Sequence, residues 1–168
     1  GVTMMWNGFK TDEFIFENHE AIVVIPEKTS DKVTLILKTE YWNAFPETEE
    51  ELLKRGHYLC YIKNDNRWGT DADIDRKARF VKFVKNKYNI QGGCVPMGMS
   101  CGGIFAVKFA AKYPELISCI YVDAPVINYM SCPCGFGIGE RTDDENFSEI
   151  LSALSMKSIS ELICYRET

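Results

Sequence analysis

The sequence predicts an α/β fold of three layers, in which a mostly parallel sheet carries helices on both faces. Two observations predict it. Short apolar runs rich in β-branched residues alternate along the chain with longer segments of helical periodicity. The 168 residues are also 46% hydrophobic and 12% aromatic, enough for one domain with a sizeable core. We expect residues 1–125 to form the core of this domain and residues 126–168 to form a helical segment of it.

The N-terminal part of the chain predicts a β-hairpin followed by a buried strand. Residues 13–17 alternate in polarity, Asn18 and His19 suit a turn, and residues 21–25 form the returning strand. After polar residues, the β-branched run 33–37 predicts a buried strand. This strand leads into an aromatic-rich loop, TEYWNAFP.

The middle of the chain predicts two helices around a strand. The segment PETEEELLKRG begins with a proline and acidic residues and ends with basic residues and a glycine, as helices do. Residues 58–62 predict a strand, and residues 64–70 a polar loop. A helix then follows, with apolar residues on one face between Ile74 and Tyr88. We expect its other face to be solvated, with Arg76, Lys77, Lys82, Lys85 and Lys87.

The stretch from Gly93 to Ala111 predicts a strand, a sharp turn and a helix, with Ser100 at the turn. Residues 98–102, GMSCG, fit the G-x-S-x-G pattern of a nucleophile elbow, which presents a serine hydroxyl above a sheet. The glycines allow strand and helix to approach closely. They also allow Ser100 a sparsely populated backbone conformation that costs about 1 to 3 kcal/mol. A plain Gly-rich turn between strand and helix is the alternative.

The C-terminal part predicts one more strand and two helices. Residues 118–122 should be a buried strand, residues 130–139 a loop, and residues 143–154 and 158–164 helices. The two helices form either a cap over the site or an ordinary crossover connection, and the sequence leaves both open.

Charge and cysteine content narrow the classes of partner. A net charge of −5 with scattered basic residues argues against nucleic acid and anionic membrane surfaces. No apolar run approaches the length of a membrane span. The compartment stays open, with the cytoplasm slightly favoured, because the chain begins with Gly1 and an upstream leader could have been removed.

The seven cysteines predict reduced thiols that pack as small hydrophobic residues, with Cys60, Cys94 and Cys119 in expected strands. Cys132 and Cys134 form the only close pair, without a second pair or a nearby histidine. We therefore expect no metal site and no cofactor.

Four segments together resemble bacterial α/β-hydrolases of the serine esterase and prolyl-oligopeptidase-like peptidase superfamily. They are the elbow GMSCGG, the helix before it, the strand ending in YVDAP and the loop TEYWNAFP. The resemblance spans most of the chain. It implies a catalytic triad in the chain order Ser, Asp, His and an oxyanion hole of two backbone N–H groups. Ser100 matches the nucleophile and Cys101 one oxyanion donor; Glu40 or Tyr41 matches the second.

The triad that the resemblance implies is incomplete in this sequence. No histidine follows Ser100, and the only two, His19 and His57, are expected in a hairpin turn and at the opposite end of the sheet. The resemblance therefore implies a chain that stops before its last strands, which would carry the Asp and the His. Such a chain should be inactive and could self-associate through an unpaired sheet edge. Asp123 is an alternative acid, although a loop-capping role beside Pro125 is the simpler reading.

Aromatic residues near the expected site suit either recognition or the core. Trp42 and Trp68, with Met99 beside the serine, are the candidate pocket residues, and the substrate would be a small-molecule ester or a short peptide.

Three functions stay open. They are a serine hydrolase, as a carboxylesterase or a peptidase of the same superfamily; a non-catalytic binding module on this scaffold; and an enzyme that uses the Cys101 thiol.

Overall fold

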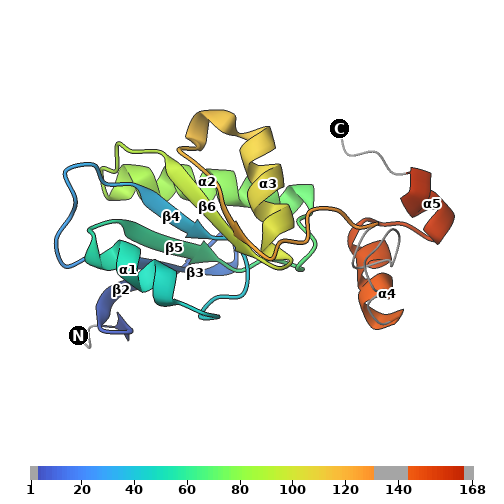
Figure 1. The fold of residues 1–168 in the computed structure, drawn as a ribbon, viewed down its shortest axis with the longest axis horizontal. Helices are drawn as coiled ribbons and strands as arrows, with labels where there is room; N and C mark the ends of the chain where they lie inside the picture. Colours follow the sequence, from blue (N-terminus) through green and yellow to red (C-terminus); the bar gives the residue numbers. More distant parts are fainter. Residues whose placement is uncertain (1–3, 131–143, 165–168) are drawn as a thin grey trace. The chain divides into compact units, whose positions relative to one another are not determined.

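The computed structural model describes residues 4–130 and 144–164, and the chain divides into two compact units, Gly1–Pro125 and Val126–Thr168. The described strands all lie in the first unit (Figure 1): β1 Met5–Trp6, β2 Phe9–Phe16, β3 His19–Ile25, β4 Leu35–Lys38, β5 Tyr58–Ile62, β6 Cys94–Met99 and β7 Tyr121–Asp123. Its helices are α1 Glu47–Lys54, α2 Asp71–Lys87, α3 Gly102–Lys112 and the short 3₁₀ helix η1 Pro114–Leu116. The second unit contains α4 Asp144–Ala153 and α5 Ile159–Cys164, close to the two helices predicted there.

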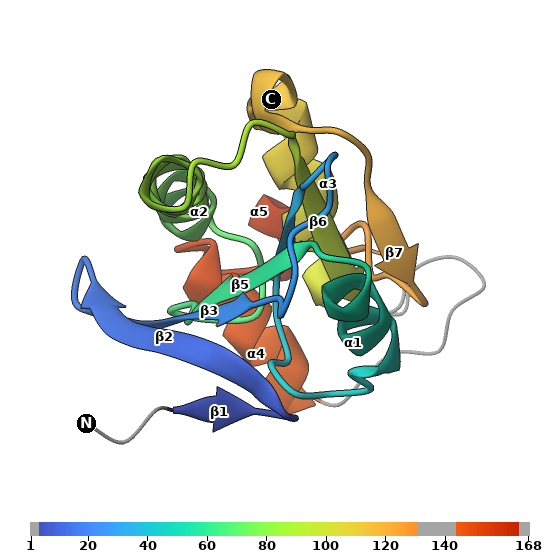
Figure 2. The same cartoon turned by 90° about the vertical axis from the view of Figure 1, so that its left-hand side faces the viewer.

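The strands form one sheet in the order β1-β2-β3-β5-β4-β6-β7 (Figure 2). Strands β1, β2, β3 and β5 pair antiparallel, whereas β5, β4, β6 and β7 pair parallel. The predicted hairpin is confirmed as β2 and β3, but the expectation that His19 lies in its turn is wrong, because His19 pairs with Phe16 as the first residue of β3. Glu17 and Asn18 connect them with φ angles of 47° and 64°, as a two-residue turn between twisted strands requires.

The sheet lies between α1 on one face and α2 with α3 on the other (Figure 2). Successive residues of a strand point to opposite faces, so neighbours in sequence belong to different cores. Leu37 and Cys60 pack with Phe80 and Phe105 of α2 and α3, and the α1 side holds another apolar cluster that contains Val24, Ile36, Leu53 and Leu59. The predicted three-layer α/β architecture is confirmed.

One prediction about α2 is wrong. Two of the basic residues expected on a solvated face are buried, since Arg76 is 9% and Lys77 0% exposed. The Lys77 ammonium donates to the Ile62 carbonyl at 3.2 Å and lies 5.2 Å from the centre of the Phe105 ring. Arg76 forms ion pairs with Asp73 and with Asp65. Lys77 is therefore buried against a strand carbonyl and an aromatic ring, and Arg76 against two carboxylates, one on its own helix and one in the loop after β5.

The expectation of a buried strand at residues 118–122 is also wrong. Strand β7 spans Tyr121–Asp123 and pairs only with β6 among the described residues. Ile120, Tyr121 and Val122 are between 40% and 44% exposed, and Cys119 is exposed as well. The reason is position, because an edge strand has a neighbour on one side only. The exposed apolar edge that the sequence predicts is present in this part of the chain.

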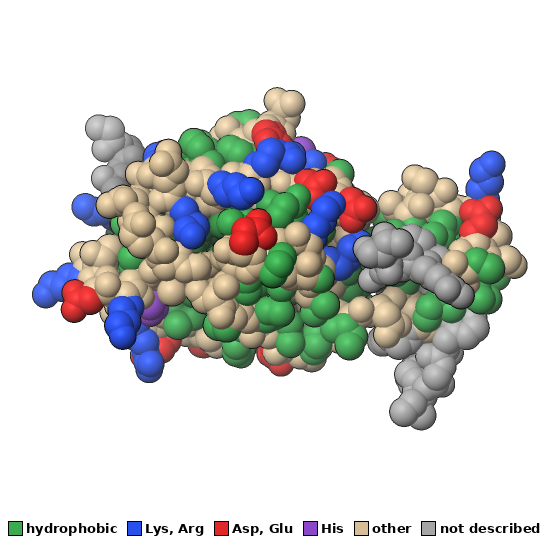
Figure 3. Space-filling model, turned by 90° about the horizontal axis from the view of Figure 1, so that it is seen from above, with side chains coloured by type: hydrophobic (Ala, Val, Ile, Leu, Met, Phe, Trp, Pro, Cys, Tyr) green, Lys and Arg blue, Asp and Glu red, His purple; other side chains and the backbone are tan. Residues whose placement is uncertain are grey.

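The charge distribution on the surface and the exposure of the cysteines can be compared with the expectations from the sequence. In Figure 3, acidic and basic side chains of the first unit are interspersed on the visible face. None of the described helices has the length and apolar character needed to cross a bilayer. Cys60, Cys94 and Cys101 are buried free thiols, and Cys119 and Cys164 are exposed free thiols. Cys132 and Cys134 lie outside the described residues.

Candidate active site

Ser100 lies in the turn between β6 and α3, outside both elements. Its φ angle is 51°, in the left-handed region that costs a non-glycine residue about 1 to 3 kcal/mol. Two backbone hydrogen bonds hold it there. The Ser100 N–H donates to the Asp123 carbonyl at 3.1 Å, and the Ser100 carbonyl accepts from the Gly103 N–H at 2.9 Å. The side chain is half-buried at the carboxyl end of the parallel strands. This is the backbone geometry that the G-x-S-x-G pattern predicts.

Two glycines of the motif make this turn possible. A Cβ atom on Gly98 would collide with the carbonyl group of Gly102, so the end of β6 and the start of α3 touch through their backbones. A Cβ atom on Gly102 would lie 2.9 Å from the Thr39 hydroxyl. The helix start is therefore packed between β6 on one side and the loop after β4 on the other.

Thr39 connects the β4 loop to the elbow. Its side chain is fully buried, and its hydroxyl lies 2.8 Å from the Gly102 carbonyl and 3.1 Å from the Met97 carbonyl. Its backbone N–H donates to the same Met97 carbonyl at 3.0 Å. The first residue of the loop is thus fixed against the strand and the helix that flank Ser100.

Of the three backbone N–H groups predicted as oxyanion-hole donors, one already donates a hydrogen bond within the protein. The Tyr41 N–H donates to Glu40 Oε1 at 2.9 Å, while Asn64 Nδ2 donates to Glu40 Oε2 at 2.6 Å. Among the described residues, the N–H groups of Cys101 and Glu40 donate to no acceptor. Of the two candidates for the second donor, the Glu40 N–H is therefore the one left open.

The Tyr41 side chain interacts with Cys101, the residue after Ser100. Burial raises the pKa of its hydroxyl to about 12, the neighbouring Cys101 thiol adds to the rise, and the Arg67 guanidinium opposes it. Tyr41 therefore remains protonated at neutral pH and can donate a hydrogen bond. The Cys101 side chain itself is 6% exposed, so its thiol faces the interior rather than solvent.

The loop after β5 is held by a polar network that includes the first histidine. Buried Asp73 accepts from the Asp65 N–H at 3.0 Å and pairs with Arg76. His19 has Nδ1 2.7 Å from the Glu17 carbonyl and Nε2 2.7 Å from Asp65 Oδ1. The Asp65 carboxylate, followed by the Glu17 carbonyl, raises the pKa of His19. Both ring nitrogens of His19 are thus engaged within this network, so neither is free to accept a proton from a serine hydroxyl.

Neither histidine reaches Ser100. Strands β5 and β4 separate β3 from β6, which places His19 about 14 Å from the elbow strand at the usual strand spacing. His57 precedes β5 at the opposite end of the parallel strands, where its Nδ1 accepts from the Thr34 N–H at 3.2 Å. Burial lowers the pKa of His57. Neither of the two histidines in the sequence therefore lies beside Ser100.

The predicted pocket residues are distributed over different parts of the first unit. Trp42 lines a groove on the α1 face, and Met99 lines a hollow of about 30 Å³ with Asp123. Trp68 is only 2% exposed. Asp123 contributes its carbonyl to Ser100, and its role as an acid stays a prediction.

Sequence reasoning missed the polar residues that support the site. The Lys38 ammonium and the Glu49 carboxylate form a buried ion pair, and Lys38 also donates to the Ala44 carbonyl at 3.2 Å. A charged residue at the end of an apolar strand was the available signal for this pair. Asn64 and Thr39 gave no such signal. No cluster of three or more metal-ligating side chains occurs in residues 4–130 and 144–164.

Comparison of the sequence with family models and with curated proteins gives no significant match. Comparison of the structure gives similar folds at low sequence identity. A thermostable carboxyl esterase from Bacillus coagulans is 14% identical with a TM-score of 0.54, covering 67% of this chain and 43% of its own. A putative carboxylesterase from Lactobacillus plantarum is 13% identical with a TM-score of 0.59, covering 85% and 66%.

A putative lipase from Acinetobacter baumannii is 15% identical with a TM-score of 0.56, covering 86% of this chain and 53% of its own. The chain thus spans between 43% and 66% of the length of these three proteins. At sequence identities this low, the structural similarity is informative about the fold alone. In its sheet order, its layers and its strand-turn-helix at Ser100, the chain has the α/β-hydrolase fold.

Proposed function

We propose that the protein is a serine hydrolase that cleaves carboxylic esters through an acyl-enzyme on Ser100. One observation carries the proposal: a serine in a left-handed turn lies between a parallel strand and a helix, next to open backbone N–H groups. The similarity in fold to esterases and a lipase supports it. The substrate class would be a small-molecule ester, with a short peptide as the alternative.

The proposed reaction has two steps. The Ser100 hydroxyl attacks the ester carbonyl carbon as a base removes its proton, and the tetrahedral oxyanion accepts hydrogen bonds from the N–H groups of Cys101 and Glu40. Each such donor can stabilise the transition state by about 3 kcal/mol, because it points at charge that develops only during the reaction. Collapse releases the alcohol, which takes up the proton. Water then attacks the acyl-serine, releasing the acid and restoring the hydroxyl.

The base is the missing part of this mechanism. A serine hydroxyl needs an adjacent general base, and His19 and His57 are both engaged elsewhere. We propose that a histidine and an acid outside these 168 residues complete the triad, and that the second unit is a cap or a crossover segment. A binding module on the same scaffold is the second candidate, favoured by the same missing base. Burial of the Cys101 thiol speaks against it as the nucleophile.

Hydrolysis of p-nitrophenyl acetate by two forms of the protein tests this proposal. The 168-residue chain should release nitrophenolate no faster than its Ser100→Ala variant. The full-length protein should turn the ester over, and Ser100→Ala should abolish that turnover while Ser152→Ala in α4 leaves it unchanged. Turnover by the full-length protein that survives Ser100→Ala would contradict the assignment of the nucleophile. A full-length protein without turnover would favour the binding module.

A further inference from the structure

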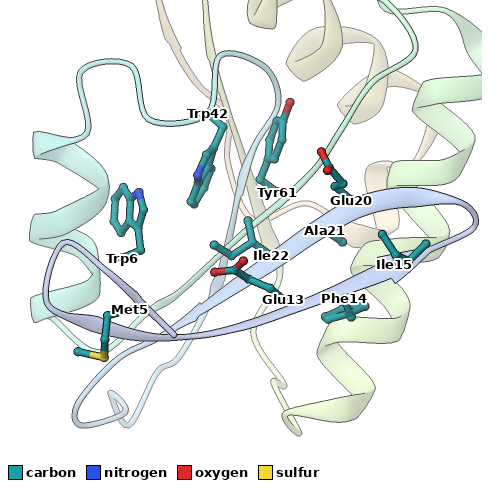
Figure 4. A pocket seen from close by; sticks show the side chains of 10 residues that line it. All are labelled: Met5, Trp6, Glu13, Phe14, Ile15, Glu20, Ala21, Ile22, Trp42 and Tyr61. Carbon is teal, nitrogen blue, oxygen red and sulfur yellow. The ribbon is translucent and has the colours of Figure 1, made fainter. Parts of the chain in front are cut away.

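A second feature of the first unit is a groove that the proposed hydrolysis does not use. It encloses about 590 Å³, within the range of small-molecule sites, on the face of the sheet that carries α1. We call it the aromatic groove (Figure 4). Its lining residues come from β1, β2, β3, β5 and the loop after β4: Met5, Trp6, Glu13, Phe14, Ile15, Glu20, Ala21, Ile22, Trp42 and Tyr61.

Three aromatic rings form one wall of this groove. Trp42 lies in the middle, with its ring centre 5.2 Å from that of Trp6 and 5.5 Å from that of Tyr61. The Trp6 indole N–H donates to Asn43 Oδ1 at 3.0 Å, which fixes β1 against the loop that carries Trp42. The wall is therefore preorganised by contacts between segments that are distant in sequence, and a ligand would not have to order it.

The charges in the groove are of one sign. Among the described residues, Glu13 and Glu20 are the charged ones that line it, and no described Lys or Arg does. The register pairs Glu13 with Ile22 and Ile15 with Glu20, so both carboxylates rise from the hairpin on the side of the rings (Figure 4). Glu13 accepts from the Thr11 hydroxyl at 3.0 Å and pairs with no cationic side chain in the described part of the chain.

Glu20 is also available to a ligand. Its one ion pair is with Lys63 at 3.4 Å, and the two side chains are 76% and 62% exposed. Pairs this exposed contribute little and exchange readily with solvent. The groove thus combines two open carboxylates with the faces and edges of three rings and the apolar side chains of Ile15 and Ile22.

We propose that the aromatic groove binds a small organic cation of the alkylammonium class, with its charge between the two carboxylates and its alkyl groups on the indoles. Aromatic faces attract cations and carry their methyl groups, which is how quaternary ammonium ions are recognised. An anion would be repelled by Glu13 and Glu20. A neutral apolar ligand would desolvate both carboxylates without compensation.

This site is independent of Ser100, which does not line the groove. A failure of the hydrolase proposal would therefore leave the binding prediction intact, and the reverse also holds. The test uses binding alone, so that the two results can be told apart. Ser100→Ala should bind the cation as the unchanged protein does.

Calorimetric titration with choline and with its neutral isostere 3,3-dimethylbutan-1-ol isolates the charge. Choline should bind at least about tenfold more tightly than the alcohol, a difference that corresponds to one favourable ionic contact. Glu13→Gln, an exposed conservative change, should weaken choline binding several-fold, while Glu115→Gln, outside the groove, should not. Added salt should weaken binding as well, because the carboxylates are accessible to solvent.

Three results would overturn the proposal. They are equal affinity for choline and its isostere, an unchanged affinity in Glu13→Gln, or no heat of binding for choline at all.

Titration with the neutral disaccharide cellobiose is a further experiment, since a sugar ring can also stack on indole. Cellobiose binding in the absence of choline binding would identify a carbohydrate groove instead.

Discussion

The turn after β6 and the loop after β4 lie next to each other, and they are stabilised in opposite ways. The β6 turn relies on glycines: the missing Cβ of Gly98 lets the strand meet the helix, and the missing Cβ of Gly102 lets the helix meet the β4 loop. The β4 loop contains three non-glycine residues with positive φ, Tyr41, Asn43 and Phe45, at 54°, 71° and 48°. Such a backbone persists only where surrounding contacts hold it.

Those contacts come from distant parts of the chain. Lys38 pairs with Glu49 of α1, Asn64 donates to the Thr39 carbonyl at 2.8 Å, and the Trp6 indole donates to Asn43. The Ser100 turn thus depends on missing side-chain volume, whereas the β4 loop depends on polar partners. Substitutions should therefore affect the two regions through different mechanisms.

The largest effect is expected from the ion pair below the β4 loop. Glu49→Gln leaves the Lys38 ammonium buried without its countercharge, which should lower the free energy of unfolding by about 3 to 5 kcal/mol in urea denaturation. Glu51→Gln is the matched control in the same helix. Its pair with Arg55 is more than half exposed on both sides, and its loss should cost less than about 1 kcal/mol. Equal costs would show that the pair does not anchor the loop.

A smaller effect should follow from filling the space in the elbow. Gly98→Ala forces a methyl group against the Gly102 backbone, and we expect a cost of about 3 kcal/mol in the same assay. Gly8→Ala is the converse case. Gly8 has φ 89° with open space around it, so alanine meets only backbone strain of about 1 kcal/mol. If Gly98→Ala costs no more than Gly8→Ala, close approach is not what shapes the turn.

Lys77 donates a hydrogen bond to the Ile62 carbonyl at the end of β5, and its burial should make the stability of the protein depend on pH. Burial lowers its pKa from 10.5 to about 8, with the charges of Asp73 and Glu40 opposing the shift. Below pH 8 the folded state carries a buried cation, and this penalty is relieved as the pH rises from about 8 to about 10.5, because the unfolded chain keeps its proton longer. Lys77→Met should therefore stabilise the protein by up to about 3 kcal/mol at pH 7, the free energy that corresponds to a pKa lowered from 10.5 to about 8.

That gain should shrink toward zero between pH 8 and 10.5, which unfolding curves at several pH values would measure. Lys82→Met, at an exposed position of the same helix, should show neither the gain nor its pH dependence. A gain that stays constant with pH would mean that lost charge burial is not its cause.

The contrast between the two loops also separates what the sequence could predict from what it could not. The hairpin, β5, the helices and the turn at Ser100 follow from local patterns: alternation, capping residues, and glycines at fixed spacing. The buried positions of Arg76 and Lys77 do not, because helical periodicity records polarity and cannot foresee the Ile62 carbonyl that accepts from Lys77 or the two carboxylates that pair with Arg76. Similarly, the composition of β7 is typical of a buried strand. Its exposure follows from its place at the end of the strand order, which the sequence does not show.

The choice between Glu40 and Tyr41 as second oxyanion donor could not be made from the sequence for the same reason. Both residues follow β4. In the structure, Asn64 fixes the Glu40 carboxylate, and this carboxylate accepts the hydrogen bond of the Tyr41 N–H. The aromatic groove likewise needs the fold, because it joins Trp6 and Trp42, which are far apart in the chain.

Labelling of the full-length protein with a fluorophosphonate probe, followed by mass spectrometry of its peptides, is the most direct test of Ser100 as the nucleophile. We expect a single adduct on the Ser100 hydroxyl that is absent in Ser100→Ala and unaffected in Ser152→Ala. Labelling at another residue, or none on a folded full-length protein, would contradict it.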